Sequence, residues 1–314
     1  MKNIIILKII VLLLSAYNIT AQEYAKIKET RSLPSNISLI DMCESNGDIS
    51  ILASDNQKIL LYSYKQNKTK NITKYFKSDR VRLVGSVLSE IIDNNKYAIY
   101  TFDGRLVSKN EFPVKDKHVL GELNVSTNNE LYFNYIYQTI NKNKKNGIIR
   151  IKDNKVIYQY DDWGIGYGGL RVVFMKDRYV INEQKEYKLN IFNYNGELVG
   201  TIKHPYYKPM AYNAEERKTL SPMVLERYQN EPFYPQVVAG IYYDNNKLII
   251  LRQRRPGQLD FIVDVFDYSE GRYIKTIKFK GPMKGTQYRI LLKDSKVIMC
   301  QVGGPKNYLY LYTY

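Results

Sequence analysis

The stretch that decides the fold is Val237–Pro282, VVAGIYYDNNKLIILRQRRPGQLDFIVDVFDYSEGRYIKTIKFKGP. Four runs rich in β-branched and aromatic residues alternate with three short breaks of turn-forming residues. The runs are Val237–Tyr243, Lys247–Arg252, Asp260–Phe266 and Arg272–Phe279. This alternation predicts four strands paired in sequence order, which is an antiparallel meander.

Weaker copies of this pattern occur along most of the chain and indicate a repeat architecture. They cover residues 35–76, 81–112, 119–160 and 170–203, and a sixth copy begins near Tyr288. The sixth copy has only three strands, the last being Tyr308–Tyr314, whereas Tyr24–Thr30 is a strand without a hairpin partner. Pairing these two strands would complete the sixth unit and cover both free edges.

The sequence therefore predicts an all-β protein, a six-bladed β-propeller of four-stranded antiparallel blades. In this prediction the N-terminal strand completes the last blade. A β-sandwich or a two-domain all-β protein is the alternative, because regularly spaced strand clusters fit either.

The N-terminus is typical of a secretory signal peptide over residues 1–21. Lys2 gives a positive start, Ile4–Leu14 is an apolar run, and Ala21 is a small residue that suits cleavage before Gln22. We expect an exported protein, periplasmic or secreted, with an uncleaved anchor as the alternative. The remaining residues, 22–314, are expected to form one propeller domain without a transmembrane segment.

Composition limits the classes of partner. The 314 residues are 44% hydrophobic, which suffices for a large core, and the net charge of +16 comes largely from single lysines spread through the turns. This distribution favours a solvated basic surface, and attraction to acidic glycans or anionic lipid stays open. No nucleic-acid partner is expected, since the chain has no arginine-rich helix, zinc-ligand spacing or RNA-recognition signature.

Two cysteines, Cys43 and Cys300, lie in strand-like apolar runs. An oxidising compartment would permit a disulfide between them. We expect two buried thiols, because free cysteine commonly packs as a small hydrophobic side chain.

The run Ile262–Ile277, IVDVFDYSEGRYIKTI, together with the signal peptide and the four-strand units, carries a family resemblance. It resembles the exported six-bladed propeller proteins common in Bacteroidetes, in the broad group similar to NHL and TolB-like propellers. The resemblance implies the fold over nearly the whole mature chain. It brings no catalytic residue with it.

The irregular features of the chain predict where a ligand would bind. In a four-stranded meander, the loop between the second and third strands and the connection to the next blade emerge at one end, here called the loop face. The largest such feature is an insertion at residues 204–236, which includes a helix-like segment, Ala214–Tyr228. It is either a ligand-contacting lid or a cap over a groove. Its candidate ligand-binding residues are His204, Tyr206, Tyr207 and Tyr212.

Two further features share this face. Trp163 and Tyr167 lie on a glycine-rich connection and would stack on a sugar or aromatic ligand, or else pack against the neighbouring blade. Arg252, Arg254 and Arg255 follow the second strand of the fifth unit. They would receive a carboxylate, sulfate or phosphate, or else remain solvated.

Material for catalysis is scarce, since His118 and His204 are the only histidines and no nucleophile motif is present. We therefore expect a monomeric, non-catalytic binding or scaffold protein that recognises an extracellular or envelope glycan, peptide or protein. No cofactor is predicted. The alternative is a propeller hydrolase or lyase with a divalent metal in the central channel, where Asp41 and Glu122 on innermost strands offer calcium ligands.

Overall fold

The computed structural model describes most of the chain from residue 23 onward. The described residues are 23–24, 26–33, 37–45, 47–55, 58–77, 80–92, 96–112, 119–138, 144–162, 171–182, 186–220, 222, 225, 234, 237–280, 287–293, 296–302 and 307–313. The predicted signal peptide lies outside them.

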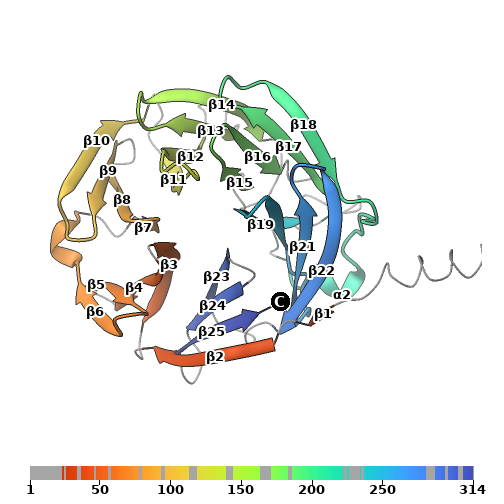
Figure 1. Ribbon diagram of the computed structural model, residues 1–314, viewed down its shortest axis with the longest axis horizontal. Helices are drawn as coiled ribbons and strands as arrows, with labels where there is room; N and C mark the ends of the chain where they lie inside the picture. Colours follow the sequence, from red (N-terminus) through yellow and green to blue (C-terminus); the bar gives the residue numbers. More distant parts are fainter. Residues whose placement is uncertain are drawn as a thin grey trace, which may run out of the picture.

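Six sheets, each built on four antiparallel strands, form a ring, and each places its first strand innermost (Figure 1). Blade 1 contains β3 (Ser38–Ser45), β4 (Asp48–Asp55), β5 (Lys58–Ser63) and β6 (Lys68–Asn71). Blade 2 contains β7 (Val81–Val84), β8 (Val87–Ile92), β9 (Lys96–Thr101) and β10 (Leu106–Glu111). Blade 3 contains β11 (Val119–Val125), β12 (Leu131–Gln138), β13 (Lys144–Arg150) and β14 (Lys155–Asp162). A 3-10 turn, η1 (Thr73–Tyr75), follows β6.

Blades 4 and 5 contain β15 (Arg171–Phe174), β16 (Arg178–Asn182), β17 (Lys188–Asn193) and β18 (Leu198–Lys203), then β19 (Val238–Asp244), β20 (Lys247–Arg252), β21 (Asp260–Asp267) and β22 (Arg272–Lys280). Blade 6 contains β23 (Gln287–Lys293), β24 (Lys296–Val302) and β25 (Asn307–Thr313), with β2 (Lys26–Leu33) as its outer strand. The predicted six-bladed propeller is thereby confirmed.

The ring closes as the sequence predicts. β2 pairs antiparallel with β25, from Lys26 opposite Thr313 to Leu33 opposite Asn307. A short strand that the sequence did not predict, β1 (Glu23–Tyr24), pairs in parallel with β22 of blade 5. The first described residues of the chain therefore join blades 5 and 6 (Figure 1).

β13 begins earlier than the composition of the chain indicates. Residues 141–146 are rich in lysine and asparagine, which predicts a solvated loop, but β13 begins at Lys144. Lys144 pairs with Gln138 of β12 and with Asp162 of β14. Polar side chains suggested a loop there, yet backbone partners on both sides continue the ladder irrespective of side-chain polarity.

The core lies between neighbouring blades. Between blades 4 and 5, for example, Val180 and Leu189 pack with Leu248, Ile250 and Phe266, all of them buried. Burying each such side chain contributes about 1.5–3 kcal/mol relative to leaving it exposed, so every interface between blades stabilises the ring.

Both cysteines are buried and unbridged, as predicted. Cys43 belongs to the cluster around Leu52 and Leu83, and Cys300 to the cluster around Ile51 and Leu309. They pack as apolar side chains in different parts of the core.

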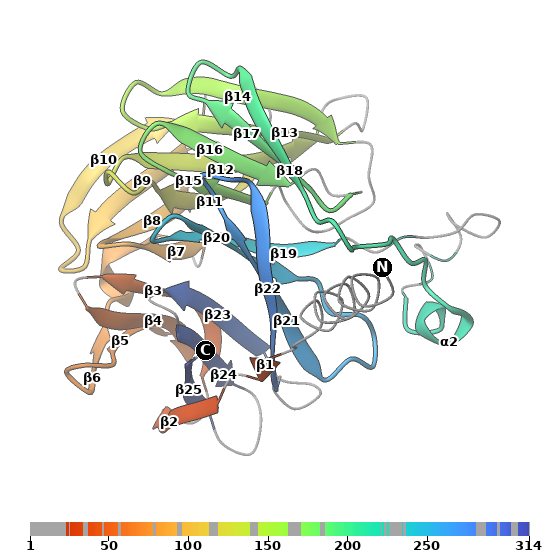
Figure 2. The same ribbon diagram turned by 45° about the vertical axis from the view of Figure 1, so that its right-hand side comes forward.

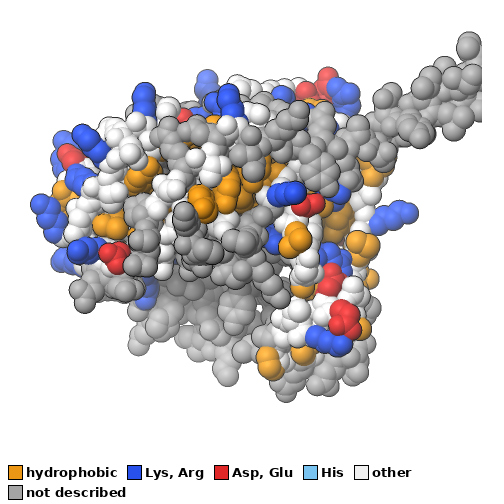
Figure 3. Space-filling view, turned by 90° about the horizontal axis from the view of Figure 1, so that it is seen from below, with side chains coloured by type: hydrophobic (Ala, Val, Ile, Leu, Met, Phe, Trp, Pro, Cys, Tyr) orange, Lys and Arg blue, Asp and Glu red, His pale blue; other side chains and the backbone are white. Residues whose placement is uncertain are grey.

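The surface shows scattered charge. In Figure 3, Lys and Arg side chains are distributed around the viewed side, with Asp and Glu among them, rather than collected in one patch. None of the helices within the described residues is long and apolar enough to cross a membrane. The insertion carries a short helix, α2 (Ala214–Arg217), that projects beyond blades 4 and 5 (Figure 2).

Candidate functional site

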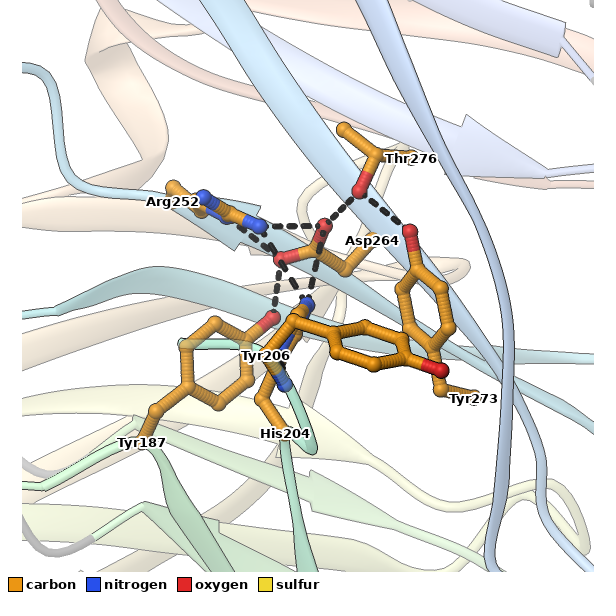
Figure 4. A network of polar contacts seen from close by, with 7 residues as sticks. All are labelled: Tyr187, His204, Tyr206, Arg252, Asp264, Tyr273 and Thr276. Carbon is orange, nitrogen blue, oxygen red and sulfur yellow. Dashed lines mark hydrogen bonds and ion pairs between the residues drawn. The ribbon is translucent and has the colours of Figure 1, made fainter. Parts of the chain in front are cut away.

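The insertion after β18 and the loop between β20 and β21 meet at the junction of blades 4 and 5. Their contact is built on a buried polar network around Asp264 of β21 (Figure 4). The sequence analysis placed both segments on one face, and their hydrogen bonds to each other agree with that placement.

Asp264 is fully buried between neighbouring strands, opposite Ile250 on β20 and Thr276 on β22. Its carboxylate accepts two hydrogen bonds from Arg252, Nε to Oδ2 at 2.5 Å and Nη2 to Oδ1 at 2.8 Å. Thr276 donates to Oδ1 and the Tyr187 hydroxyl to Oδ2, each at 2.5 Å. A buried carboxylate is tolerated because paired donors replace the water it has lost.

The electrostatics match this arrangement. Burial raises the pKa of Asp264, but hydrogen bonds from His204 and Arg252 outweigh it and bring the pKa to about 2. Burial and the neighbouring carboxylate hold the pKa of Tyr187 well above its usual value. At neutral pH the network therefore contains an ionised Asp264, a charged Arg252 and a neutral Tyr187.

His204 connects the insertion to this network and is almost fully buried. Its Nδ1 accepts the backbone N–H of Tyr206 at 3.2 Å, so in the neutral imidazole the proton is on Nε2. Nε2 lies 3.6 Å from Asp264 Oδ1 and 3.3 Å from Arg252 Nη2. The ring also packs against Tyr187, with centroids 4.8 Å apart. Both ring nitrogens thus face groups of the protein, an arrangement that suits a structural anchor.

Arg255 fastens the insertion at a second point. Its Nε donates to Glu216 Oε1 at 2.6 Å and its Nη2 to Glu216 Oε2 at 2.5 Å, while further donors reach the carbonyl oxygens of Met210 and Ala211. Glu216 also forms a capping box with Asn213 at the start of α2. The hydrogen bonds from Arg255 lower the pKa of Glu216 to about 2.

The third predicted arginine turns inward. Arg254 donates twice to the carbonyl oxygen of Gln258, at 3.0 and 2.6 Å, and its guanidinium lies 4.7 Å from the centre of the Phe261 ring. All three guanidinium groups therefore bond to the protein itself and shape the loop face. Their role in ligand binding stays a prediction.

The remaining predicted tyrosines differ in how far their side chains are exposed to solvent. Tyr207 and Tyr212 are half-buried beneath guanidinium groups, with Arg252 5.7 Å from the ring centre of Tyr207 and Arg255 5.5 Å from that of Tyr212. Tyr206 is 57% exposed. Trp163 and Tyr167 lie outside the described residues.

Exposed apolar side chains accompany these anchors. Met210 in the insertion is 62% exposed, and Leu259 in the loop before β21 is 68% exposed. We call Tyr206, Met210 and Leu259 the rim. Arg252 and Arg255 hold the insertion against the loop before β21. The segments that carry the rim are therefore fixed relative to each other.

Asp41 and Glu122, the residues suggested as calcium ligands, lie on the innermost strands of blades 1 and 3. Asp41 accepts the backbone N–H of its neighbour Met42 at 2.9 Å and that of Leu83 in blade 2 at 3.1 Å, so it links two blades. Glu122 lies on β11, and its side chain is not described. Across the described ranges, no group of three or more His, Cys, Asp or Glu side chains is placed to hold a metal ion.

Sequence reasoning missed Asp264, Thr276 and Tyr187. Asp264 stands between Val263 and Val265 in an otherwise apolar strand. A carboxylate inside such a run is the one available signal, since it requires a buried partner. Arg252, twelve residues away, is that partner.

Comparison with solved structures finds similar chains at low sequence identity. A member of the DUF4221 family from Bacteroides vulgatus aligns over 92% of this chain and 97% of its own, with 12% identity and a TM-score of 0.52. The β-propeller domain of the trilobed protease from Pyrococcus furiosus aligns over 88% of this chain and 83% of its own, with 11% identity and a TM-score of 0.44. No family model matches the sequence, and no curated protein matches it significantly. The likeness to the Bacteroides protein shows the propeller fold.

Proposed function

We propose that the protein is an exported, non-catalytic binding or scaffold propeller that recognises a glycan, peptide or protein partner through the rim on its loop face. One observation carries the proposal: the exposed side chains of Tyr206, Met210 and Leu259 are presented on segments joined by the Arg255–Glu216 ion pair. A fixed surface binds with a smaller entropic cost than a loop that must order on binding.

The chemistry of His204 supports binding rather than catalysis. A general base needs a free lone pair within hydrogen-bond reach of the proton that it removes. Nδ1 of His204 accepts from Tyr206, and Nε2 faces Asp264 and Arg252. The signal-peptide pattern of residues 1–21 supports the exported location.

The experiment compares two sets of exposed apolar side chains. The triple variant Tyr206→Ser, Met210→Ser, Leu259→Ser removes the rim. A control variant, Leu106→Ser, Val107→Ser, Leu198→Ser, removes similarly exposed residues from β10 and β18. Both are tested against immobilised glycans, peptides and purified envelope proteins.

We expect the rim variant to lose binding at least about tenfold while the control binds like the wild type, and we expect both to melt like the wild type. Equal binding by all three proteins would refute the proposal. Turnover of a bound glycan or peptide would refute the non-catalytic part of it.

A further inference from the structure

A level rich in charged residues runs around the centre of the ring, on the innermost strands and, for Arg80, directly before β7. The innermost strand of each blade ends at a hairpin. The residue pairs that close these hairpins are, in blade order, Ser45–Asp48, Val84–Val87, Ser126–Glu130, Met175–Arg178, Asp244–Lys247 and Lys293–Lys296. Counting back four positions from the first residue of each pair gives the same level in every blade. In blade order, the six residues at this level are Asp41, Arg80, Glu122, Arg171, Gly240 and Arg289. At a rise of about 3.3 Å per residue, the level lies roughly 13 Å from the hairpin turns.

The direction of these side chains follows from contacts already made on the same strand face. Asp41 accepts the N–H of Leu83, and Cys43, two residues further on the same face, donates to Gly85 O at 3.1 Å. Tyr242, two residues after Gly240, donates to Ile290 O at 3.0 Å. In each case the side chain reaches the innermost strand of the next blade.

By the same alternation, Arg171 of blade 4 faces β19 of blade 5. The equivalent position there is Gly240, where a Cβ would lie 3.0 Å from the ring of Tyr242, on the face of β19 that is directed at blade 6 and away from Arg171. Nε of Arg171 is buried and has no hydrogen-bond partner among the described residues. Within the described part of the chain, Arg171 forms no ion pair. A buried guanidinium nitrogen without an acceptor is costly unless a ligand supplies one.

Positive charge exceeds negative charge at this level. Arg82 lies two residues beyond Arg80 on the same strand face, and it donates to the neighbouring Val81 O at 2.9 Å. The sequence therefore places three arginines at this level and a fourth next to it, against two acidic residues, Asp41 and Glu122. Asp41 already accepts two backbone N–H groups.

We propose that this level of the channel is an oxyanion site, with Arg171 as its principal ligand and a carboxylate or sulfate group of an acidic molecule as its occupant. The planar guanidinium binds such a group through two parallel hydrogen bonds. Positive charge gathered at one level also attracts anions to it. The site is separate from the rim, so it stands whether or not the rim binds a partner.

The experiment titrates sulfate and glucuronate, in separate arms, into the protein by calorimetry, with chloride at matched ionic strength as the control for screening. Arg171→Gln is compared with Arg178→Gln. Arg178 lies on β16 of the same blade, is exposed and pairs with Asp177. We expect saturable binding of at least one of the two anions, weakened about 10- to 100-fold by R171Q through the loss of charge-assisted hydrogen bonds and unchanged by R178Q.

Two further measurements make the result specific. Without added anion, R171Q should melt no lower than the wild type, because it removes a charge that lacks an acceptor. The rim variant should bind the anion like the wild type, which separates this proposal from the preceding one. Should R171Q fail to fold, Arg171→Lys keeps the charge without the planar fork and should still bind more weakly. Absence of saturable binding in both arms, or equal affinity in the wild type and the Arg171 variant tested, would overturn the proposal.

Discussion

Arg255 Nη2 lies 2.5 Å from Glu216 Oε2, joining the loop before β21 to a helix that precedes it by 39 residues. Because the same guanidinium also bonds to the carbonyl oxygens of Met210 and Ala211, this one side chain holds much of the described insertion in place. The loop face therefore depends on this charged contact as well as on the buried network around Asp264, which holds His204.

Glu216→Gln should loosen the insertion without unfolding the ring. Gln keeps the shape of the side chain but loses the ion pair, which costs roughly 1.5–3 kcal/mol for hydrogen bonds between charged groups. Tryptic cleavage after Arg217 and Lys218 should accelerate about tenfold or more, while the melting temperature stays nearly constant. Glu215→Gln is the matched control, because Glu215 pairs with Lys218 at an exposed position on the same helix. Equal cleavage rates in the two variants would contradict this role.

Acid should release the insertion through the same contact. The folded pKa of Glu216, about 2, lies below its usual 4.5, so its contribution is fully present above pH 4.5 and is lost as the pH falls toward 2. Hydrogen exchange of the amides of α2 should therefore rise, beyond its intrinsic pH dependence, across that interval. E216Q should remove most of this extra rise. A rise of the same size in the variant would assign it to another group.

Asp264→Asn should destabilise the whole fold. The change leaves the guanidinium of Arg252 buried beside a neutral amide, and breaking a buried pair in this way costs about 3–5 kcal/mol. Urea unfolding should show the loss as a lower midpoint. Glu270→Gln, which removes an exposed partner of Arg272, should change stability by less than about 0.5 kcal/mol. Unfolding of D264N at the wild-type midpoint would show that the network contributes little.

The thiols should stay unreactive until the protein unfolds. Burial raises the pKa of Cys300 to about 12, and burial together with the nearby Asp41 raises that of Cys43 further. The reactive thiolate is therefore scarce at neutral pH. A thiol reagent such as dithionitrobenzoate should label neither cysteine in the native protein and both in denaturant. Rapid labelling in the native state would contradict the buried placement.

A truncated variant tests the closure of the ring by β2. A variant starting at Ser38 lacks β2 and leaves the edge of β25 unpaired. Open edges promote association, so we expect this variant to aggregate on sizing chromatography. A synthetic peptide of Lys26–Leu33 should restore the elution position of the intact protein. A truncated protein that elutes without aggregates and is fully stable would show that β2 is dispensable.

The fold could be predicted from sequence because its signals are local. Turn pairs such as Asp103-Gly104 and Asn195-Gly196 mark hairpins, and Gly104 and Gly196 indeed adopt positive φ of 87°. Counting strands in the last unit was enough to pair β2 with β25.

The network at the candidate site could be predicted only in part. The topology of a meander placed His204 and Arg252 at one end of the sheets, but it does not say which side chains face each other between blades. Tyr187, from blade 4, reaches Asp264 of blade 5 across 77 residues of sequence. Such a pairing depends on how the two sheets pack, and no local pattern encodes it. The innermost arginines escaped notice for a similar reason, since their common level emerges only once six hairpins are aligned.

The closure of blade 6 also sets an order of events. Lys26–Leu33 is synthesised long before its partner Asn307–Thr313. At translation rates of 5–20 residues per second, the early strand waits roughly 15–60 s for its complement. During that interval the same strand can complete the ring of another molecule, so crowded nascent chains are prone to exchange their first strands and form linked dimers.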